Sequence, residues 1–163
     1  MKILCGTDLL PKSSSALERA GMLAERLAAQ LVLVHAVAAA EPHDQLDEAR
    51  RQAGRQLRLS AVPPRRHRAV APAFEVRAGS PVQVLIDTAR ELEPDLIVLG
   101  SHRRRFASDV LIGTIAERVL RHVDCPLLVV RRMPLHAYRR VLVVLNGEGA
   151  NDIVAVTGAS CSG

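Results

Sequence analysis

The stretch DLIVLGSHRRRFASDVLIGTIAERVLR, residues 95–121, decides the fold of this chain. Its apolar run Leu96–Leu99 ends at Gly100, a basic loop follows, and Gly113-Thr114 begins a helical pattern. Strand, glycine, loop and helix N-terminus is the order that places backbone N–H groups around a phosphate. The stretch therefore predicts a nucleotide-binding α/β domain.

Strand and helix patterns alternate along the rest of the chain. Short apolar runs typical of buried strands cover residues 2–7, 31–37, 74–78, 96–99 and 127–130. Apolar residues recur with helical spacing over residues 13–30, 41–62, 82–92 and 114–123. Ser13 and Ser80 are the expected N-caps of the first and third helices. This alternation predicts an α/β fold, a doubly wound five-stranded parallel sheet in an open α/β/α sandwich.

The expected sheet brings two polar strand ends together. Asp8 follows the first strand and Gly100 ends the fourth. In doubly wound sheets, ligands bind beyond the carboxyl ends of the strands where the strand order reverses. If the first and fourth strands are neighbours, Asp8 and Gly100 face the same crevice. Asp8 could instead be a strand-end residue that caps a turn, and Thr114 could serve only as a helix N-cap. His35, inside an apolar run, is more typical of a satisfied core histidine than of a catalytic one.

Composition limits the class of protein. The chain has 163 residues, of which 48% are hydrophobic, so a sizeable core is available, although it contains no Trp, one Tyr and two Phe. Cys5 and Cys125 lie in apolar runs and are interpreted as small buried hydrophobes. Lys2 leads directly into a strand pattern and no apolar stretch approaches roughly 20 residues, so neither a signal peptide nor a membrane span is expected. A cytoplasmic location is the default expectation.

The net charge of +5 comes from 22 Lys and Arg residues, nearly all of them arginine. Arginines cluster at residues 65–68 and again at residues 103–105. No aromatic residues are interleaved with them to stack on bases, so a solvated basic surface is favoured over nucleic-acid binding.

The end of the chain does not fit the five-strand unit. Arg140–Leu145 forms another strand pattern that resembles the run after Met1. The predicted organisation is a domain over residues 1–132 and, over residues 133–163, a linker with the start of a second repeat, an extra strand or a hairpin.

Taken in order, the motifs resemble the universal stress protein family over Met1 to about Arg132. The residues that carry the resemblance are Thr7-Asp8, Ser13, Val34-His35-Ala36, Gly79-Ser80-Pro81, Asp95–His102, Gly113-Thr114, the run AERVLRH after Ile115 and the run CPLLVVR from Cys125. The resemblance implies a fold like that of the adenine nucleotide alpha hydrolases. It also allows for tandem members, which would explain the second strand pattern at Arg140.

The resemblance implies an ATP site as well. ATP-binding members carry the motif G-x2-G-x9-G-[ST], and the same spacing occurs here between Gly100, Arg103, Gly113 and Thr114. The matching positions expected beside the phosphates and ribose are Gly100, His102, Arg103, Gly113, Thr114 and Ile115. Thr7 and Asp8 are expected beside the ribose and adenine, and the main chain of Ala36 beside the adenine edge.

Two positions depart from the family pattern. Arg103 replaces the second glycine of the motif, and Leu10 replaces a serine expected two residues after Asp8. An arginine in the loop can pair with phosphate oxygens. It can equally fill the space that a phosphate needs, and a left-handed backbone there would add roughly 1–2 kcal/mol of strain. Both interpretations of Arg103 stay open.

Two functions follow from the resemblance. The first is a cytoplasmic ATP-binding stress-response regulator, with Mg²⁺ held only through the phosphates, which acts without catalysis. The second is a family member that has lost nucleotide binding and works as a dimeric protein-interaction module. The sequence contains no Walker-type Gly-Lys-[ST] motif and no convincing metal cluster, which argues against an ATP-hydrolysing enzyme. Family members dimerise through the last strand, so Leu127–Val130 is the expected homodimer interface.

Overall fold

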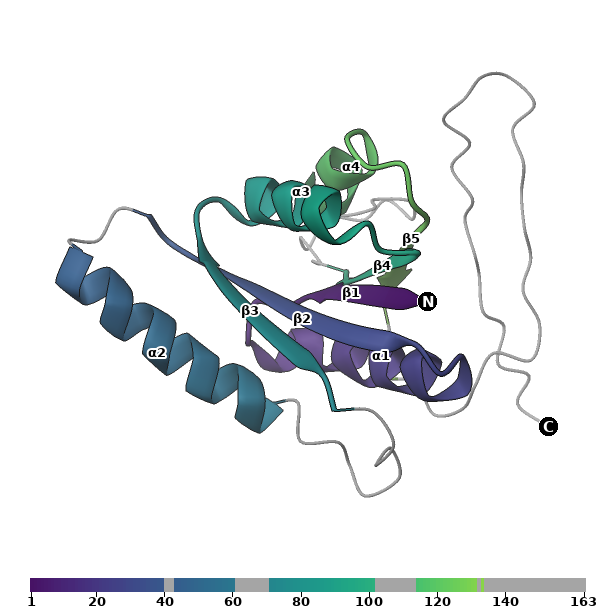
Figure 1. Cartoon of the computed structure of the whole chain (residues 1–163), viewed down its shortest axis with the longest axis horizontal. Helices are drawn as coiled ribbons and strands as arrows, with labels where there is room; N and C mark the ends of the chain where they lie inside the picture. The colour runs from purple at the N-terminus through teal and green to yellow at the C-terminus, as the bar shows by residue number, and fades with distance from the viewer. Residues whose placement is uncertain (40–42, 61–70, 102–113, 132, 134–163) are drawn as a thin grey trace, which may run out of the picture. The chain divides into compact units, whose positions relative to one another are not determined.

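Five parallel strands form the centre of the fold, in the order β3-β2-β1-β4-β5 (Figure 1). The computed structural model describes residues 1–39, 43–60, 71–101, 114–131 and 133. The strands are β1 (Lys2–Gly6), β2 (Gln30–Val37), β3 (Ala73–Ala78), β4 (Leu96–Gly100) and β5 (Leu127–Val130). The helices are α1 (Ser14–Arg26), which follows the short 3-10 turn η1 (Pro11–Ser13), α2 (His43–Ser60), α3 (Pro81–Leu92) and α4 (Thr114–Leu120).

Strands β1 and β4 pair in parallel, with Ile3 opposite Leu96 and Gly6 opposite Leu99, which meets the condition for Asp8 and Gly100 to face the same crevice. On its other side β1 pairs with β2. The chain builds the sheet outward from β1 in one direction through β2 and β3, and in the other through β4 and β5. The strand order therefore reverses between β1 and β4, which is where a doubly wound sheet binds ligands.

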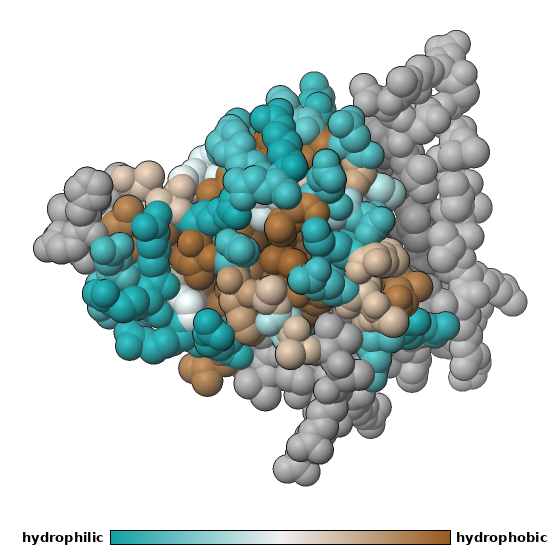
Figure 2. Space-filling view, in the orientation of Figure 1, coloured by the Kyte–Doolittle hydropathy of each residue, from teal (hydrophilic) through white to brown (hydrophobic). Residues whose placement is uncertain are grey.

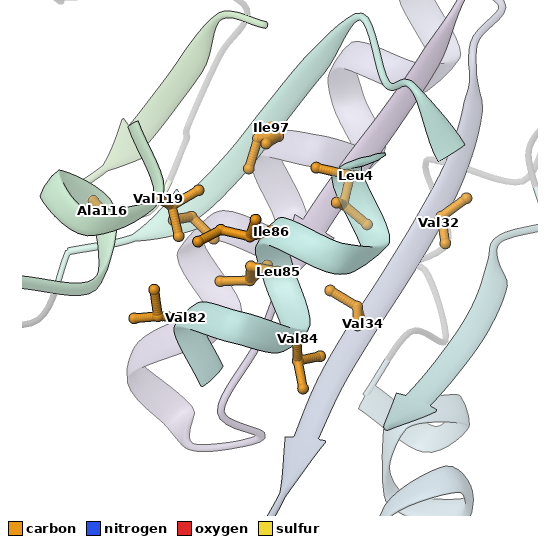
Figure 3. Packing of buried hydrophobic residues seen from close by; sticks show 12 residues of the cluster. Leu4, Val32, Val34, Val82, Val84, Leu85, Ile86, Ile97, Ala116 and Val119 are labelled. Carbon is orange, nitrogen blue, oxygen red and sulfur yellow. The ribbon is translucent and has the colours of Figure 1, made fainter. Parts of the chain in front are cut away.

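Helices cover both faces of the sheet. Figure 1 shows α1 and α2 on one face and α3 and α4 on the other. The central strands β1, β2 and β4 are buried on both faces, and this explains why their sequences are mainly apolar runs, whereas the half-exposed edge strand β3 alternates Phe74 and Val76 with charged residues. Within β1, Ile3 and Cys5 pack into the cluster under α1, whereas Leu4 packs into the cluster under α3. Figure 3 shows this second cluster, in which Leu85 and Ile86 of α3 meet side chains of the central strands.

Figure 2 shows hydrophilic residues over the outward faces of α2 and α3, with hydrophobic residues gathered between the two helices. Two contacts join the edge strand β3 to the helices beside it. Arg77 bonds to Glu91 of α3 at 2.7 Å, and the Arg58 guanidinium of α2 lies 4.9 Å from the centre of the Phe74 ring.

The caps and ends of the helices differ in part from the prediction. The Ser80 side chain accepts a hydrogen bond from the Gln83 backbone N–H at 3.3 Å, which confirms it as an N-cap. Ser13 occupies the predicted N-cap position of α1, but its side chain makes no capping hydrogen bond. The helix expected over residues 114–123 ends at Leu120, because the chain tightens there and the His122 N–H bonds to Val119 O at 2.9 Å.

The described elements all belong to one compact unit, Met1–Met133. The strand predicted at residues 140–145 lies outside the described residues. The division of the chain at residue 132 stays a prediction.

Candidate functional site

A pocket of about 160 Å³ opens where the strand order reverses, beyond the carboxyl ends of β1, β2 and β4. Helix α3 and the first turn of α4 complete its wall. The lining residues are Gly6, Thr7, Asp8, Ser13, Val34, His35, Ala36, Pro81, Val84, Leu85, Leu99, Gly100, Ser101, Ile115 and Ala116. The position is the one that the sheet topology predicts for a ligand.

Gly6 keeps the base of the pocket narrow. A Cβ atom at this position would lie 2.7 Å from Leu99 Cδ2 and 2.9 Å from Leu85 Cδ2. Both leucines line the pocket and are almost fully buried. A side chain at position 6 would therefore force Leu85 and Leu99 to shift from the positions that they take at the end of β1.

The turn after β1 presents one carboxylate at the pocket. Asp8 is exposed, and its Oδ1 atom accepts a hydrogen bond from the Leu10 backbone N–H at 3.0 Å. This is an Asx-turn, in which an aspartate side chain bonds to the backbone two residues on. The sequence left open whether Asp8 caps a turn or binds a ligand. The geometry allows both roles, because Oδ1 holds the turn while Oδ2 makes no hydrogen bond within the described part of the chain.

Thr7 uses its hydroxyl inside the same turn. Its Oγ1 atom accepts from the Leu9 N–H at 3.1 Å and lies 2.8 Å from Ser13 Oγ. Ser13 Oγ donates to Leu10 O at 2.8 Å. Because a serine hydroxyl has a single proton, the bond between the two hydroxyls runs from Thr7 to Ser13. Ser13 thus stabilises the turn instead of capping α1.

His35 connects the turn to β2. Its Nδ1 atom lies 2.8 Å from Thr7 O, and the ring is half-buried. A carbonyl oxygen can only accept, so Nδ1 carries a proton and donates it. The prediction of a satisfied histidine agrees with this bond, but His35 also lines the pocket.

Apart from Ser101, the remaining side chains of the lining are apolar. Side chains from β2, β4, α3 and α4 form this wall: Val34, Ala36, Val84, Leu85, Leu99, Ile115 and Ala116. No Lys or Arg side chain from the described residues contributes to it. This part of the pocket therefore suits a flat, weakly polar group with a hydroxyl or amino donor near Asp8, and not a phosphate.

The structure brings together five of the nine residues predicted for the site: Thr7, Asp8, Ala36, Gly100 and Ile115. Thr114 begins α4, next to the pocket residue Ile115. His102, Arg103 and Gly113 lie outside the described residues. Sequence reasoning missed the contributions of Gly6 and of Val84 and Leu85 in α3, because no motif marks these residues.

Known proteins show the same fold and sequence pattern. The family model for universal stress proteins matches residues 1–131. The chain belongs to the universal stress protein family. A curated relative, a universal stress protein of Methanocaldococcus jannaschii, is 34% identical over 58 residues, or 36% of this chain and 34% of the relative. The match thus spans about a third of the length of that relative.

Solved structures of universal stress proteins cover most of the chain. A family member from Burkholderia pseudomallei is 31% identical with a TM-score of 0.62, and the match covers 80% of this chain and 96% of that one. A universal stress protein in complex with cAMP is 24% identical with a TM-score of 0.57, covering 80% and 96%. One from Archaeoglobus fulgidus in complex with dAMP is 18% identical with a TM-score of 0.53, covering 80% and 98%. The last two support the fold alone.

Two features are absent from the described residues. These residues contain no group of three or more His, Cys, Asp or Glu side chains able to hold a metal ion. None of their helices combines the length and apolar character of a membrane span.

Proposed function

We propose that this universal stress protein binds an adenine nucleotide, ATP, in the pocket between β1 and β4, and that it acts as a cytoplasmic stress-response regulator. The observation that carries the proposal is the position of the pocket. It lies at the reversal of strand order, and its lining includes Asp8 together with Ile115 and Ala116 from the first turn of α4. Two proteins with this fold are described in complex with the adenine nucleotides cAMP and dAMP.

Different parts of the lining suit the base and the ribose of an adenine nucleotide. The apolar wall of Val84, Leu85 and Ala116 offers contact surface for a purine ring, and the backbone of Ala36 offers polar groups at its edge. Asp8 Oδ2 can accept a hydrogen bond from a ribose hydroxyl. The phosphates would then lie toward Gly100 and the start of α4, where backbone N–H groups and the helix dipole favour anions. Mg²⁺, if present, would be held through the phosphates.

We further propose that the nucleotide is a signal and not a substrate. Of the polar side chains at the pocket, the Thr7 and Ser13 hydroxyls and His35 Nδ1 are already engaged in the turn. Hydrolysis requires a base that orients water beside the γ-phosphate. Asp8 lies at the proposed ribose end of the pocket, which does not suit it for that role.

Calorimetric titration with ATP and Mg²⁺ tests the proposal, using the wild-type chain and two variants. Arg103→Gly restores the glycine of the family motif, and Gly113→Arg is expected to abolish binding. Heat with the wild type that disappears in Gly113→Arg supports the proposal. Heat only with Arg103→Gly shows that Arg103 closes the site, and it favours the second function, an interaction module without nucleotide. If neither the wild type nor Arg103→Gly releases or absorbs heat, the result contradicts a nucleotide site in this chain.

The open edge of β5 supports a homodimer. Among the strands of the described residues, β5 pairs with β4 alone, and its residues Leu127, Leu128 and Val129 are half-buried apolar side chains. The carbonyls of Pro126 and Val130 accept bonds from β4, so by alternation the backbone groups of Leu127 and Val129 point to the open edge. Val129→Pro removes an outward N–H without breaking a bond to β4. Light scattering should show a dimer for the wild type and a monomer for Val129→Pro, and a monomeric wild type would contradict the proposal.

A further inference from the structure

We propose that His35 is a positioning residue for Asp8. Through its bond to the Thr7 carbonyl, and together with Ser13, it holds the Asp8 carboxylate in the orientation in which it binds the nucleotide. This inference rests on the proposed function, because it assigns Asp8 to ligand binding. In this proposal β2 contributes to the site through the His35 side chain, which holds the turn and does not contact the ligand.

The backbone of Thr7 is fixed from both sides by β2. The Thr7 N–H donates to Val34 O at 3.0 Å, which continues the ladder between β1 and β2 by one residue. The Thr7 carbonyl has no further strand partner and accepts instead from His35 Nδ1 at 2.8 Å. Both peptide groups that flank Thr7 are thereby held in place. The second of these peptide groups joins Thr7 to Asp8, so the bond from His35 also fixes the start of the Asp8 backbone.

Hydrogen bonds of the Thr7 and Ser13 side chains also stabilise this turn. Thr7 is 9% exposed and Ser13 is 6% exposed, so the bond between their hydroxyls is shielded from water. Ser13 also holds Leu10 O, and Thr7 also holds the Leu9 N–H. Asp8 lies between these anchors. Its remaining freedom is limited further by the bond from the Leu10 N–H to Oδ1, which leaves Oδ2 as the oxygen for a ligand.

The turn has a conformation that local preference does not supply. Leu9 has φ of 59°, the left-handed region that side chains other than those of Gly, Asn and Asp rarely adopt. Such residues persist when the surrounding structure determines them, and they concentrate at functional sites. Here the anchors are Thr7, Ser13 and His35. A carboxylate held in advance loses little freedom on binding, which favours affinity.

Two substitutions of His35 separate positioning from direct contact. In asparagine the side-chain NH₂ occupies the place of His Nδ1, so His35→Asn retains the donor to Thr7 O and lacks Nε2. In glutamine the NH₂ occupies the place of Nε2, so His35→Gln lacks the donor to Thr7 O. A positioning role predicts that His35→Gln weakens ATP binding about tenfold and that His35→Asn stays within about threefold of the wild type. The opposite order shows that His35 contacts the ligand through Nε2 and overturns the inference.

A double-mutant cycle with Asp8→Asn tests whether His35 acts through Asp8. In the Asp8→Asn background, His35→Gln should cause no further loss of affinity, because the carboxylate that it positions is already gone. A full tenfold loss in that background overturns the inference. Thermal unfolding of each variant, measured without ligand, separates loss of binding from loss of fold.

A measurement without nucleotide separates this inference from the proposed function. Hydrogen exchange should show the Leu9 and Leu10 amides protected in the wild type and in His35→Asn, and at least tenfold less protected in His35→Gln. Equal protection in all three proteins overturns the positioning role even if ATP binds. If protection follows the prediction but ATP does not bind the wild type, the tether exists and the nucleotide function is wrong.

Discussion

Gly6→Ala should lower the free energy of unfolding and weaken ATP binding in the pocket, although it changes a single hydrogen to a methyl group. The new Cβ would lie 2.7 Å from Leu99 Cδ2 and 2.9 Å from Leu85 Cδ2, whereas carbon atoms pack best at about 3.5–4.0 Å. Both leucines are 5% exposed, so neither can move freely into solvent. Overpacking of this kind in a closed core costs about 1–3 kcal/mol.

Gly54→Ala is the matched control. Gly54 lies within α2, and nothing lies within 4 Å of the position that its Cβ would take. The same chemical change should there increase helix stability by about 0.5–1 kcal/mol. The free energies of unfolding of the two variants should therefore differ by roughly 1.5–4 kcal/mol, the sum of these two ranges, in opposite directions from the wild type.

Urea unfolding followed by circular dichroism measures both values. A Gly6→Ala midpoint equal to or above that of the wild type would refute the reasoning. Because Leu85 and Leu99 line the pocket, Gly6→Ala should also weaken ATP binding, whereas Gly54→Ala should leave the affinity unchanged.

Three further predictions concern stability. Glu93 ends α3 with φ of 46° and is exposed, so Glu93→Gly should stabilise the fold by about 1 kcal/mol in urea unfolding, while Arg90→Gly inside the helix should destabilise it by a similar amount. Burial raises the pKa of the Cys5 thiol to about 12 from 9.0, so above pH 9 the unfolded state releases the proton first. Stability should then fall by up to about 1.4 kcal/mol per pH unit between pH 9 and 12, relative to Cys5→Ala; parallel curves for the two proteins would contradict this. The Lys2 ammonium donates a hydrogen bond to Leu92 O at the C-terminus of α3, at 2.5 Å. Lys2→Met should therefore lower the free energy of unfolding by about 1 kcal/mol. An unchanged urea midpoint would show that the contact contributes nothing.

Much of the fold could be predicted because the central strands are buried on both faces. Such strands form nearly continuous apolar runs: Leu96–Leu99 is unbroken, and Leu31–Val37 is interrupted only by His35. The pairing of β1 with β4 was only a condition for placing Asp8 and Gly100 in one crevice, because apolar runs do not specify which strands are neighbours. The end of α4 was predicted less well. Val123 continues the helical spacing and still packs against the core, but the backbone tightens before it.

The site was predicted only where a motif marked it. Thr7, Asp8 and Gly100 stand at strand ends, and their positions follow from the topology. The bond between His35 and Thr7 joins residues 28 positions apart, and no local pattern encodes that distance. Gly6 resembled an ordinary strand residue, because its function depends on how closely Leu85 approaches in three dimensions.

Chemical-shift mapping of the backbone amides during titration with ATP tests the central claim most directly. The chain carries a net charge of +5, so ATP could associate with arginines on its surface without entering the pocket. The proposed site predicts saturable shifts at Thr7, Asp8, Ala36, Gly100 and Ile115, which persist at 0.3 M salt. Shifts confined to arginine-rich segments such as α2, lost at that salt concentration, would contradict it.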